Sequence, residues 1–374
     1  MMNHAANTEM QMLARAASEF ASGELISHRQ ETDRFPFGPF YTTILEKAFK
    51  LDFLHITLPA AMGGMGMSIT ALCMVLERLC REDASLGALI LTHCFAQEIL
   101  IQAGAAEILE NRVGRAEAPE RFLIACPLFN NPSEIRHVAR LEKKGDRLTL
   151  SGQIDYMVLG GVADLALVPA AGEGQASWVY CLVDLRQPSV SISEPVLSHG
   201  LRCCPAVDLK FQNAEAVPVG VDNGGHTLFE AAAAKLSVAA AAISAGIMKG
   251  SFDEALAYAK EREQGGHKLV GWSDMRKMLA DMAVHIEIAD MVVSKGCQSV
   301  DQGAKGWEKR ALAAAIHVQE SAVQVTTDGV QALGGVGYMQ DFGQEKRFRD
   351  AKHIQACFGL TPLKRIKLLE QIIA

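Results

Sequence analysis

The spacing of hydrophobic residues changes twice along this chain, near residues 122 and 218, and this change constrains the fold more than any other feature. Before residue 122 and after residue 222, apolar residues recur at every third or fourth position, as on the buried face of a helix. Between Phe122 and Pro218 they alternate with polar residues, which is typical of strands. The pattern predicts a mainly α protein with a central β domain, divided into residues 1–121, 122–220 and 221–374.

Each block contains segments that can be assigned more closely. In the first block, Leu72, Val75, Leu76 and Leu79 form one apolar helical stripe. In the β block, alternation on both sides of residues 144–146 indicates a hairpin within a small antiparallel sheet or barrel. The last block contains four long helical segments, which predict a bundle, with Ser273 capping one of them: 228–263, 273 onwards, 307–333 and 360–373.

Composition excludes several classes of protein. The formal net charge of -7 argues against a nucleic-acid binder, which needs a basic face. The 9 cysteines are scattered without a CxxC pair, and the 11 histidines form no metal-binding pattern, so we expect reduced thiols and no metal. The first residues do not resemble a signal peptide, and the apolar stretch 236–248 is too short to span a bilayer. We therefore expect a cytoplasmic protein without a membrane span.

Two further features near the C-terminus each allow two interpretations. The glycine-rich turn at 331–337 is either a helix C-cap or a place where the backbone approaches a cofactor closely. The basic run that follows is either a solvated, salt-bridged surface or a contact for a phosphorylated partner such as a nucleotide. It consists of Lys346, Arg347, Arg349 and Lys352.

The stretch from Gln331 to Gln355, QALGGVGYMQDFGQEKRFRDAKHIQ, resembles the C-terminal signature of the acyl-CoA dehydrogenase family. Other pieces of that family's pattern occur in order, so that the resemblance spans about residues 10 to 372. They are at 58–66, 76–79, 143–161 and 258–264. The resemblance implies a helical domain, a β domain and a four-helix bundle. It also implies FAD-dependent α,β-dehydrogenation of an acyl-CoA thioester.

The residues expected to act as the catalytic base depart from the family pattern. In the usual members a glutamate removes the α proton of the substrate, and Phe358 stands at that position here. A minority of members place the glutamate at the position of Leu236, which Ser237 follows here. Neither known base is therefore present. A relocated base would have to be another carboxylate, and the candidates are Glu230, Asp155, Glu261 and Asp341.

The flavin contacts implied by the resemblance are unevenly kept. The segment that cradles a chain's own flavin is changed throughout 126–133, and Val158 replaces the threonine whose hydroxyl meets flavin N5, although Tyr156 keeps an aromatic wall. The contacts that a chain gives to its neighbour's flavin are mostly present, although the usual phenylalanine is Gly265. They are Arg262, Gln264, Gln331, Gly334 and Gly335.

These departures favour a catalytically degenerate subunit that completes the FAD site of an active homologous partner. In that hypothesis FAD is shared across a subunit interface, the partner binds most of the acyl-CoA, and the assembly is a dimer or tetramer. One alternative is a self-sufficient FAD-dependent acyl-CoA dehydrogenase with a relocated base. Another is a structural or regulatory pseudoenzyme that binds no flavin.

Overall fold

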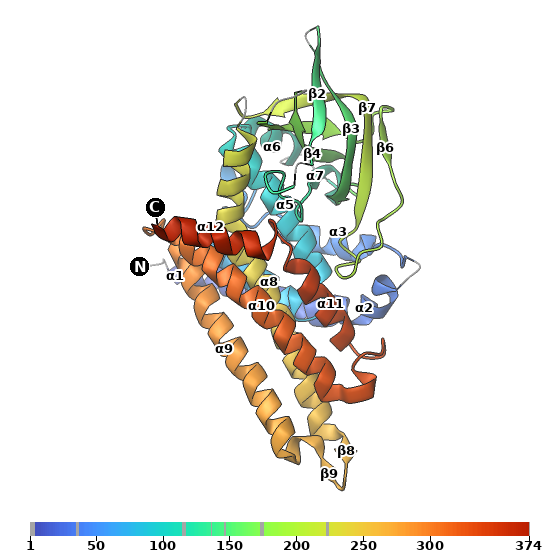
Figure 1. The fold of residues 1–374 in the computed structure, drawn as a ribbon, viewed down its shortest axis with the longest axis vertical. Coiled ribbons are helices and arrows are strands. Elements are labelled where there is room, and N and C mark those ends of the chain that lie inside the picture. The colour runs from blue at the N-terminus through green and yellow to red at the C-terminus, as the bar shows by residue number, and fades with distance from the viewer. Residues whose placement is uncertain are drawn as a thin grey trace.

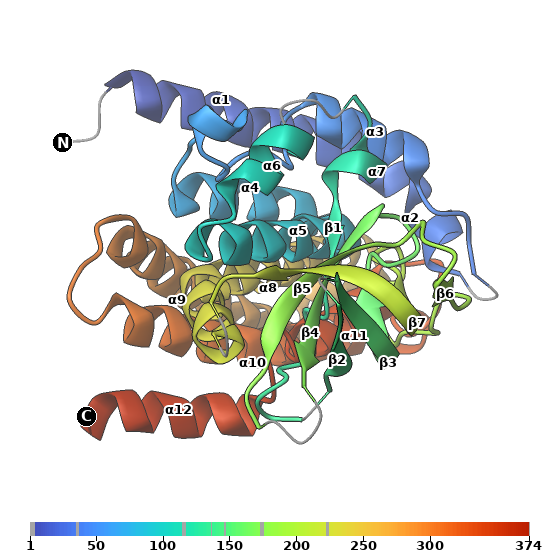
Figure 2. The same ribbon diagram turned by 90° about the horizontal axis from the view of Figure 1, so that it is seen from above.

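The computed structural model describes residues 4–34, 37–113, 117–135, 137–145, 147–172, 176–221 and 224–373. Helices come first, strands follow, and helices return, as the hydrophobic spacing predicts. In Figure 1 the strands gather at one end of the molecule and the long C-terminal helices extend to the other. Viewed from above in Figure 2, the first and last helices lie on opposite sides of the molecule.

The N-terminal block is built around two buried helices. Asp83 caps the second of them by accepting a hydrogen bond from the Ser85 N–H at 2.7 Å. The predicted stripe of Leu72, Val75, Leu76 and Leu79 is completely buried, so this expectation is confirmed. The helices are α1 (His4–Phe20), α2 (Ile26–Asp33), α3 (Thr42–Lys50), α4 (Ile69–Cys80), α5 (Ala84–Gln102), α6 (Ala106–Val113) and α7 (Pro119–Phe122).

The β block forms a sheet that closes on itself, because β4, β2, β3, β7 and β5 pair in that order and β5 pairs again with β4. The predicted hairpin is present as β2 and β3. Most of the pairings are antiparallel, as expected, although β4 runs parallel to β1 and β2. The chain reverses twice between β2 and β4, which restores the original direction. The strands are β1 (Ile124–Ala125), β2 (Ala139–Lys144), β3 (Arg147–Val158), β4 (Leu165–Ala171), β5 (Val179–Asp184), β6 (Val190–Ile192) and β7 (Ala206–Val219).

The C-terminal block is a bundle in which α8 packs on α9 and α10, and α12 packs on α10. Ser273 does not cap α9, contrary to our expectation, because Trp272 holds the cap position and Ser273 is already helical. The limits of the three domains remain predictions. The elements are α8 (Gly225–Glu261), the hairpin of β8 (Glu263–Gln264) and β9 (His267–Lys268), α9 (Ser273–Asp301), α10 (Trp307–Leu333), α11 (Gln344–Ile354) and α12 (Thr361–Ile373).

Most of the basic run forms salt bridges, as one interpretation expected, but Lys346, Arg347 and Arg349 are buried and not solvated, since all are less than 10% exposed. Their burial also excludes them as a contact for a phosphorylated partner. Only Lys352 faces solvent. The reason is that α11 lies against acidic side chains from distant parts of the chain. Lys346 Nζ lies 2.6 Å from an Asp350 oxygen and 3.2 Å from an Asp83 oxygen.

The same buried network joins all three blocks of the chain. Arg349 pairs with Asp33 in α2 and with Glu345 in α11. Asp350 also accepts a hydrogen bond from the Leu201 N–H at 2.7 Å, which ties α11 to the loop before β7. The charged part of the C-terminal signature therefore has a structural role here, since its cations are neutralised inside the protein.

Helices α5 and α8 are both long and apolar enough to cross a membrane. Their most apolar windows are 94% and 83% buried inside the fold, so the protein core accounts for their hydropathy. The apolar stretch 236–248, which seemed too short for a span, is the middle of the much longer α8.

A buried histidine at the junction of the N-terminal and β blocks makes stability depend on pH. His93 Nδ1 accepts a hydrogen bond from the Ile124 N–H at 3.2 Å, and the imidazole is fully buried. Burial lowers the pKa of His93 to about 3, whereas the unfolded value is about 6.5. Between these values the unfolded chain binds one proton more, so stability falls as pH falls, by about 1.4 kcal/mol per pH unit.

This pH dependence is testable by urea denaturation between pH 7 and pH 4. We expect His93→Gln to lose less stability over that range than the wild-type chain, because glutamine does not titrate. The exposed His28→Gln is the matched control and should behave like the wild type. Parallel stability curves for the wild type and His93→Gln would contradict the assignment.

Candidate functional site

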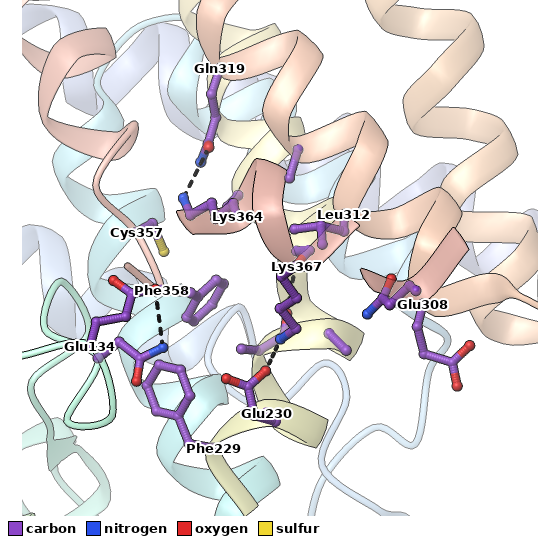
Figure 3. Close-up of a pocket in the computed structure, with 17 residues that line it drawn as sticks. Glu134, Phe229, Glu230, Glu308, Leu312, Gln319, Cys357, Phe358, Lys364 and Lys367 are labelled. Carbon is purple, nitrogen blue, oxygen red and sulfur yellow. Dashed lines mark hydrogen bonds and ion pairs between the residues drawn. The ribbon is translucent and has the colours of Figure 1, made fainter. Parts of the chain in front are cut away.

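An enclosed cavity lies between α8, α10, α12 and the loop that follows α11 (Figure 3). Phe358, at the usual base position, lines it, whereas Leu236, at the other family base position, does not, although the next residue, Ser237, does. Its free space is about 30 Å³, which has room for one or two water molecules. The cavity therefore borders Phe358 but has no room for an acyl group.

Phe358 is held firmly at the usual base position. Its N–H donates to the Leu128 carbonyl at 3.0 Å, and its ring packs against Phe95 with centroids 5.0 Å apart. Its φ is 62°, a left-handed conformation that costs a non-glycine residue about 1 kcal/mol or more. The surrounding contacts maintain this conformation. An apolar ring with fixed contacts thus stands where the family resemblance predicts a carboxylate, and Leu236 is buried as well.

Several charged side chains surround the cavity. Lys364 Nζ donates to the Gln355 carbonyl at 3.1 Å and to Gln319 Oε1 at 3.4 Å, and burial lowers the pKa of Lys364. Lys367 forms an ion pair with Glu230 across the cavity wall. Glu134 accepts a hydrogen bond from the Leu360 N–H at 2.8 Å.

Of the four candidate relocated bases, only Glu230 lines this cavity. Asp155, Glu261 and Asp341 are exposed elsewhere. The carboxylate of Glu230 is already paired with the ammonium of Lys367. Sequence reasoning missed Glu134, Lys364 and Lys367. The two lysines, spaced by three on α12, were the one signal that could have placed them on a common face.

Much of the segment 126–133, which the resemblance expects to cradle a flavin, is buried against the rest of the chain, although Phe129 and Asn130 are half-buried and Ser133 is exposed. Val158, the residue expected to face flavin N5, is 0% exposed, as are Cys126 and Leu128. The Cys126 N–H donates to the Val158 carbonyl at 3.2 Å, and Leu128 accepts from the Phe358 N–H. The segment 126–133 is therefore linked to Val158 and to Phe358 by direct backbone hydrogen bonds.

Aromatic side chains complete this closure. The Tyr156 hydroxyl lies 2.6 Å from Ser198 Oγ and 3.0 Å from His353 Nε2. His353 Nδ1 lies 2.7 Å from the Gly200 carbonyl, so Nδ1 carries the hydrogen and Nε2 accepts from Tyr156. Burial lowers the pKa of His353, which favours this neutral form. The Phe129 ring packs on His353 with centroids 4.5 Å apart.

The residues around Val158 therefore do not fit a flavin held in the way that the family pattern implies. Val158, the residue expected to meet N5, is fully buried and lacks the hydroxyl of the family's threonine. No reaction step through a flavin held by this cradle follows from the structure.

The residues expected to reach a neighbour's flavin lie together at the far end of the bundle, away from the cavity (Figure 1). Contact between Tyr258 and Phe342, with ring centroids 5.7 Å apart, joins the end of α8 to the segment after α10 there. The predicted residues are all exposed: Arg262, Gln264, Gln331, Gly334 and Gly335.

Two details make this end of the bundle open to a ligand. Within the described residues, the Arg262 guanidinium forms no hydrogen bond or ion pair, so its donors are free. A Cβ added to Gly334 or Gly335 would meet nothing within 4 Å, and Gly334 has a φ of 62° and a ψ of −136°, which essentially only glycine adopts. These residues fit a negatively charged group that approaches the backbone closely.

Comparison with known proteins identifies the family. The family model described as acyl-CoA dehydrogenase, N-terminal domain, matches residues 7–113, and the C-terminal domain model matches residues 220–372. Together they cover well over half of the chain, which belongs to the acyl-CoA dehydrogenase family. Acyl-CoA dehydrogenation is the activity of this family, whose members generally bind FAD and are oligomeric.

Individual relatives are similar along their whole length. The chain is 28% identical over 369 residues to a cyclohex-1-ene-1-carbonyl-CoA dehydrogenase of Geobacter metallireducens, covering 96% of each protein. It is 27% identical over 374 residues to the probable acyl-CoA dehydrogenase fadE25 of Mycobacterium tuberculosis, covering 98% of this chain and 95% of the relative. The solved structure of butyryl-CoA dehydrogenase from Megasphaera elsdenii has the same fold, with a TM-score of 0.88, 21% identity and 98% coverage of each chain.

Proposed function

We propose that this chain is a non-catalytic subunit of the acyl-CoA dehydrogenase type, which completes the FAD site of a homologous, catalytically intact partner. The observation that carries the proposal is the contrast between its two half-sites. The cradle for its own flavin is closed, with Val158 fully buried. The residues expected to contact a neighbour's flavin are exposed. Among the described residues, the guanidinium of Arg262 has no hydrogen-bond or ion-pair partner.

The cavity supports the non-catalytic part of this proposal. The α carbon of an acyl thioester is weakly acidic, so its proton leaves only to a positioned base. Phe358 and Leu236 cannot accept a proton, and about 30 Å³ of free space does not admit an acyl chain. In this arrangement the partner binds the acyl-CoA and performs the chemistry.

FAD, when bound in the partner, supplies the group that accepts the β hydride. The role of this chain is to hold the cofactor. Arg262 offers a planar, permanently charged fork, which suits a diphosphate. The open backbone at Gly334 and Gly335 allows the cofactor to approach without a steric clash.

The test is the amount of flavin bound per chain, measured by absorbance after size exclusion. The chain alone should carry almost none. Mixed with an intact homologue, it should form an assembly with half the flavin of an ordinary family member, because each mixed interface has one complete site. Arg262→Ala should lower that flavin content, whereas Lys268→Ala, an exposed cation on the same hairpin, should not. Tight binding of one FAD per subunit by the chain alone would contradict the proposal.

A second candidate, the self-sufficient enzyme with a relocated base, is favoured by one observation, which is that Glu230 lines the cavity beside Phe358 (Figure 3). If the chain is such an enzyme, the purified protein should turn over acyl-CoA. Glu230→Gln should then abolish the turnover, whereas Asp155→Asn should not. The ion pair between Glu230 and Lys367 counts against it.

A further inference from the structure

The hairpin between α8 and α9 explains why the family's phenylalanine is missing at Gly265. Gln264 pairs with His267, which leaves a two-residue loop with φ values of 64° at Gly265 and 84° at Gly266. Such a tight turn needs positive φ at both positions and therefore favours glycine. A Cβ on Gly265 would also lie 3.1 Å from Trp272 Cζ2. A phenylalanine at Gly265 would thus be strained in the turn and crowded by the indole beside it.

Trp272 occupies the space next to this turn and is fixed there. Its Nε1–H donates to the Gln264 carbonyl at 3.2 Å. Its ring meets His267 edge to face, with centroids 5.5 Å apart and an interplanar angle of 81°. The side chain is nevertheless 44% exposed, so a large rigid aromatic surface remains free at the same hairpin as Arg262.

We infer that Trp272 replaces the missing phenylalanine as an aromatic wall for an FAD bound mainly by the partner subunit, next to the diphosphate contact at Arg262. This inference rests on the proposed function. The ligand that fits is a dinucleotide, because a flat ring system packs on the indole while a linked diphosphate reaches the guanidinium of Arg262, three residues before Gly265. The indole needs no rearrangement to act, since its two anchoring contacts already hold it in place.

The experiment is reconstitution of the flavin-depleted mixed assembly with FAD, followed through quenching of flavin fluorescence. We expect Trp272→Leu to raise the Kd for FAD about tenfold or more, as loss of a stacked aromatic does. Trp272→Phe should recover most of this loss because it restores an aromatic face. Trp307→Phe, which changes a tryptophan at the start of α10, is the matched control and should leave the Kd unchanged.

The other outcomes separate this inference from the proposed function. If Trp272→Leu leaves the Kd unchanged while Arg262→Ala raises it, the role of Trp272 is wrong and the shared flavin site stands. If Trp272→Leu and Trp272→Phe raise the Kd equally, the indole only supports the hairpin, and the inference is also wrong. If neither Arg262→Ala nor Trp272→Leu has an effect, the proposed function fails as well.

Discussion

Phe358→Glu is expected to leave the purified chain inactive, even though it restores the carboxylate that the family uses. The general base contributes only about 10²–10⁴ to the rate, and the variant would still lack room for the acyl chain and a flavin cradle. The measurement is butyryl-CoA-dependent reduction of an artificial electron acceptor in the presence of added FAD.

The reciprocal variant provides the control. Replacing the aligned glutamate by phenylalanine in the intact homologue should reduce its turnover by about 10²–10⁴, which shows that the assay detects the loss of this base. Turnover by the unmodified chain alone, at a rate typical of enzymes, would mean that another carboxylate acts as the base. Glu230 would then be the first residue to substitute.

Lys346→Met is expected to destabilise the fold by about 3–5 kcal/mol, because it removes one partner from a buried ionic network. Burial alone lowers the pKa of Lys346, but the carboxylates of Asp350, Asp83 and Asp33 more than offset this and raise it, so the side chain stays charged. Without that cation these carboxylates would be left close together in a buried site.

Urea denaturation at pH 7 measures this effect as a lower free energy of unfolding. Lys277→Met is the matched control, since Lys277 pairs with Asp281 on an exposed helix face and its loss should not change the transition measurably. Equal midpoints for Lys346→Met and the wild type would show that the network contributes little.

The architecture was predictable because it depends on local spacing. The expected helix at 307–333 has the same limits in α10, and the hairpin around residue 145 is present. Burial of the basic run was not predictable, because the carboxylates that neutralise it lie far away in the chain: Asp33 is 316 residues from Arg349. The hydrophobic pattern of a helix shows which of its side chains are polar, but it does not show which distant residue will form an ion pair with them.

In the candidate site, too, single residues could be predicted from the sequence but contacts between distant residues could not. Comparison with the family pattern showed that Phe358, Leu236 and Val158 differ from the residues that the family usually has at those positions. Closure of the cradle depends on pairs such as Tyr156 and His353, which are 197 residues apart, and no local pattern predicts such a contact. Likewise, the sequence shows only that Gly265 replaces the family's phenylalanine, whereas the structure shows that Trp272 lies beside it.

The burial of Val158 also has a consequence for how the amount of this protein in the cell depends on the supply of FAD. A protein that binds a cofactor only when folded is stabilised by it, by about 2.7 kcal/mol at a free concentration 100 times the Kd. Val158 is fully buried in this chain, so under the proposed function the chain without its partner gains no such stability from FAD. An intact homologue, which binds FAD itself, would lose stability when riboflavin, the precursor of FAD, is short. Riboflavin shortage should therefore leave this chain unpartnered and in excess.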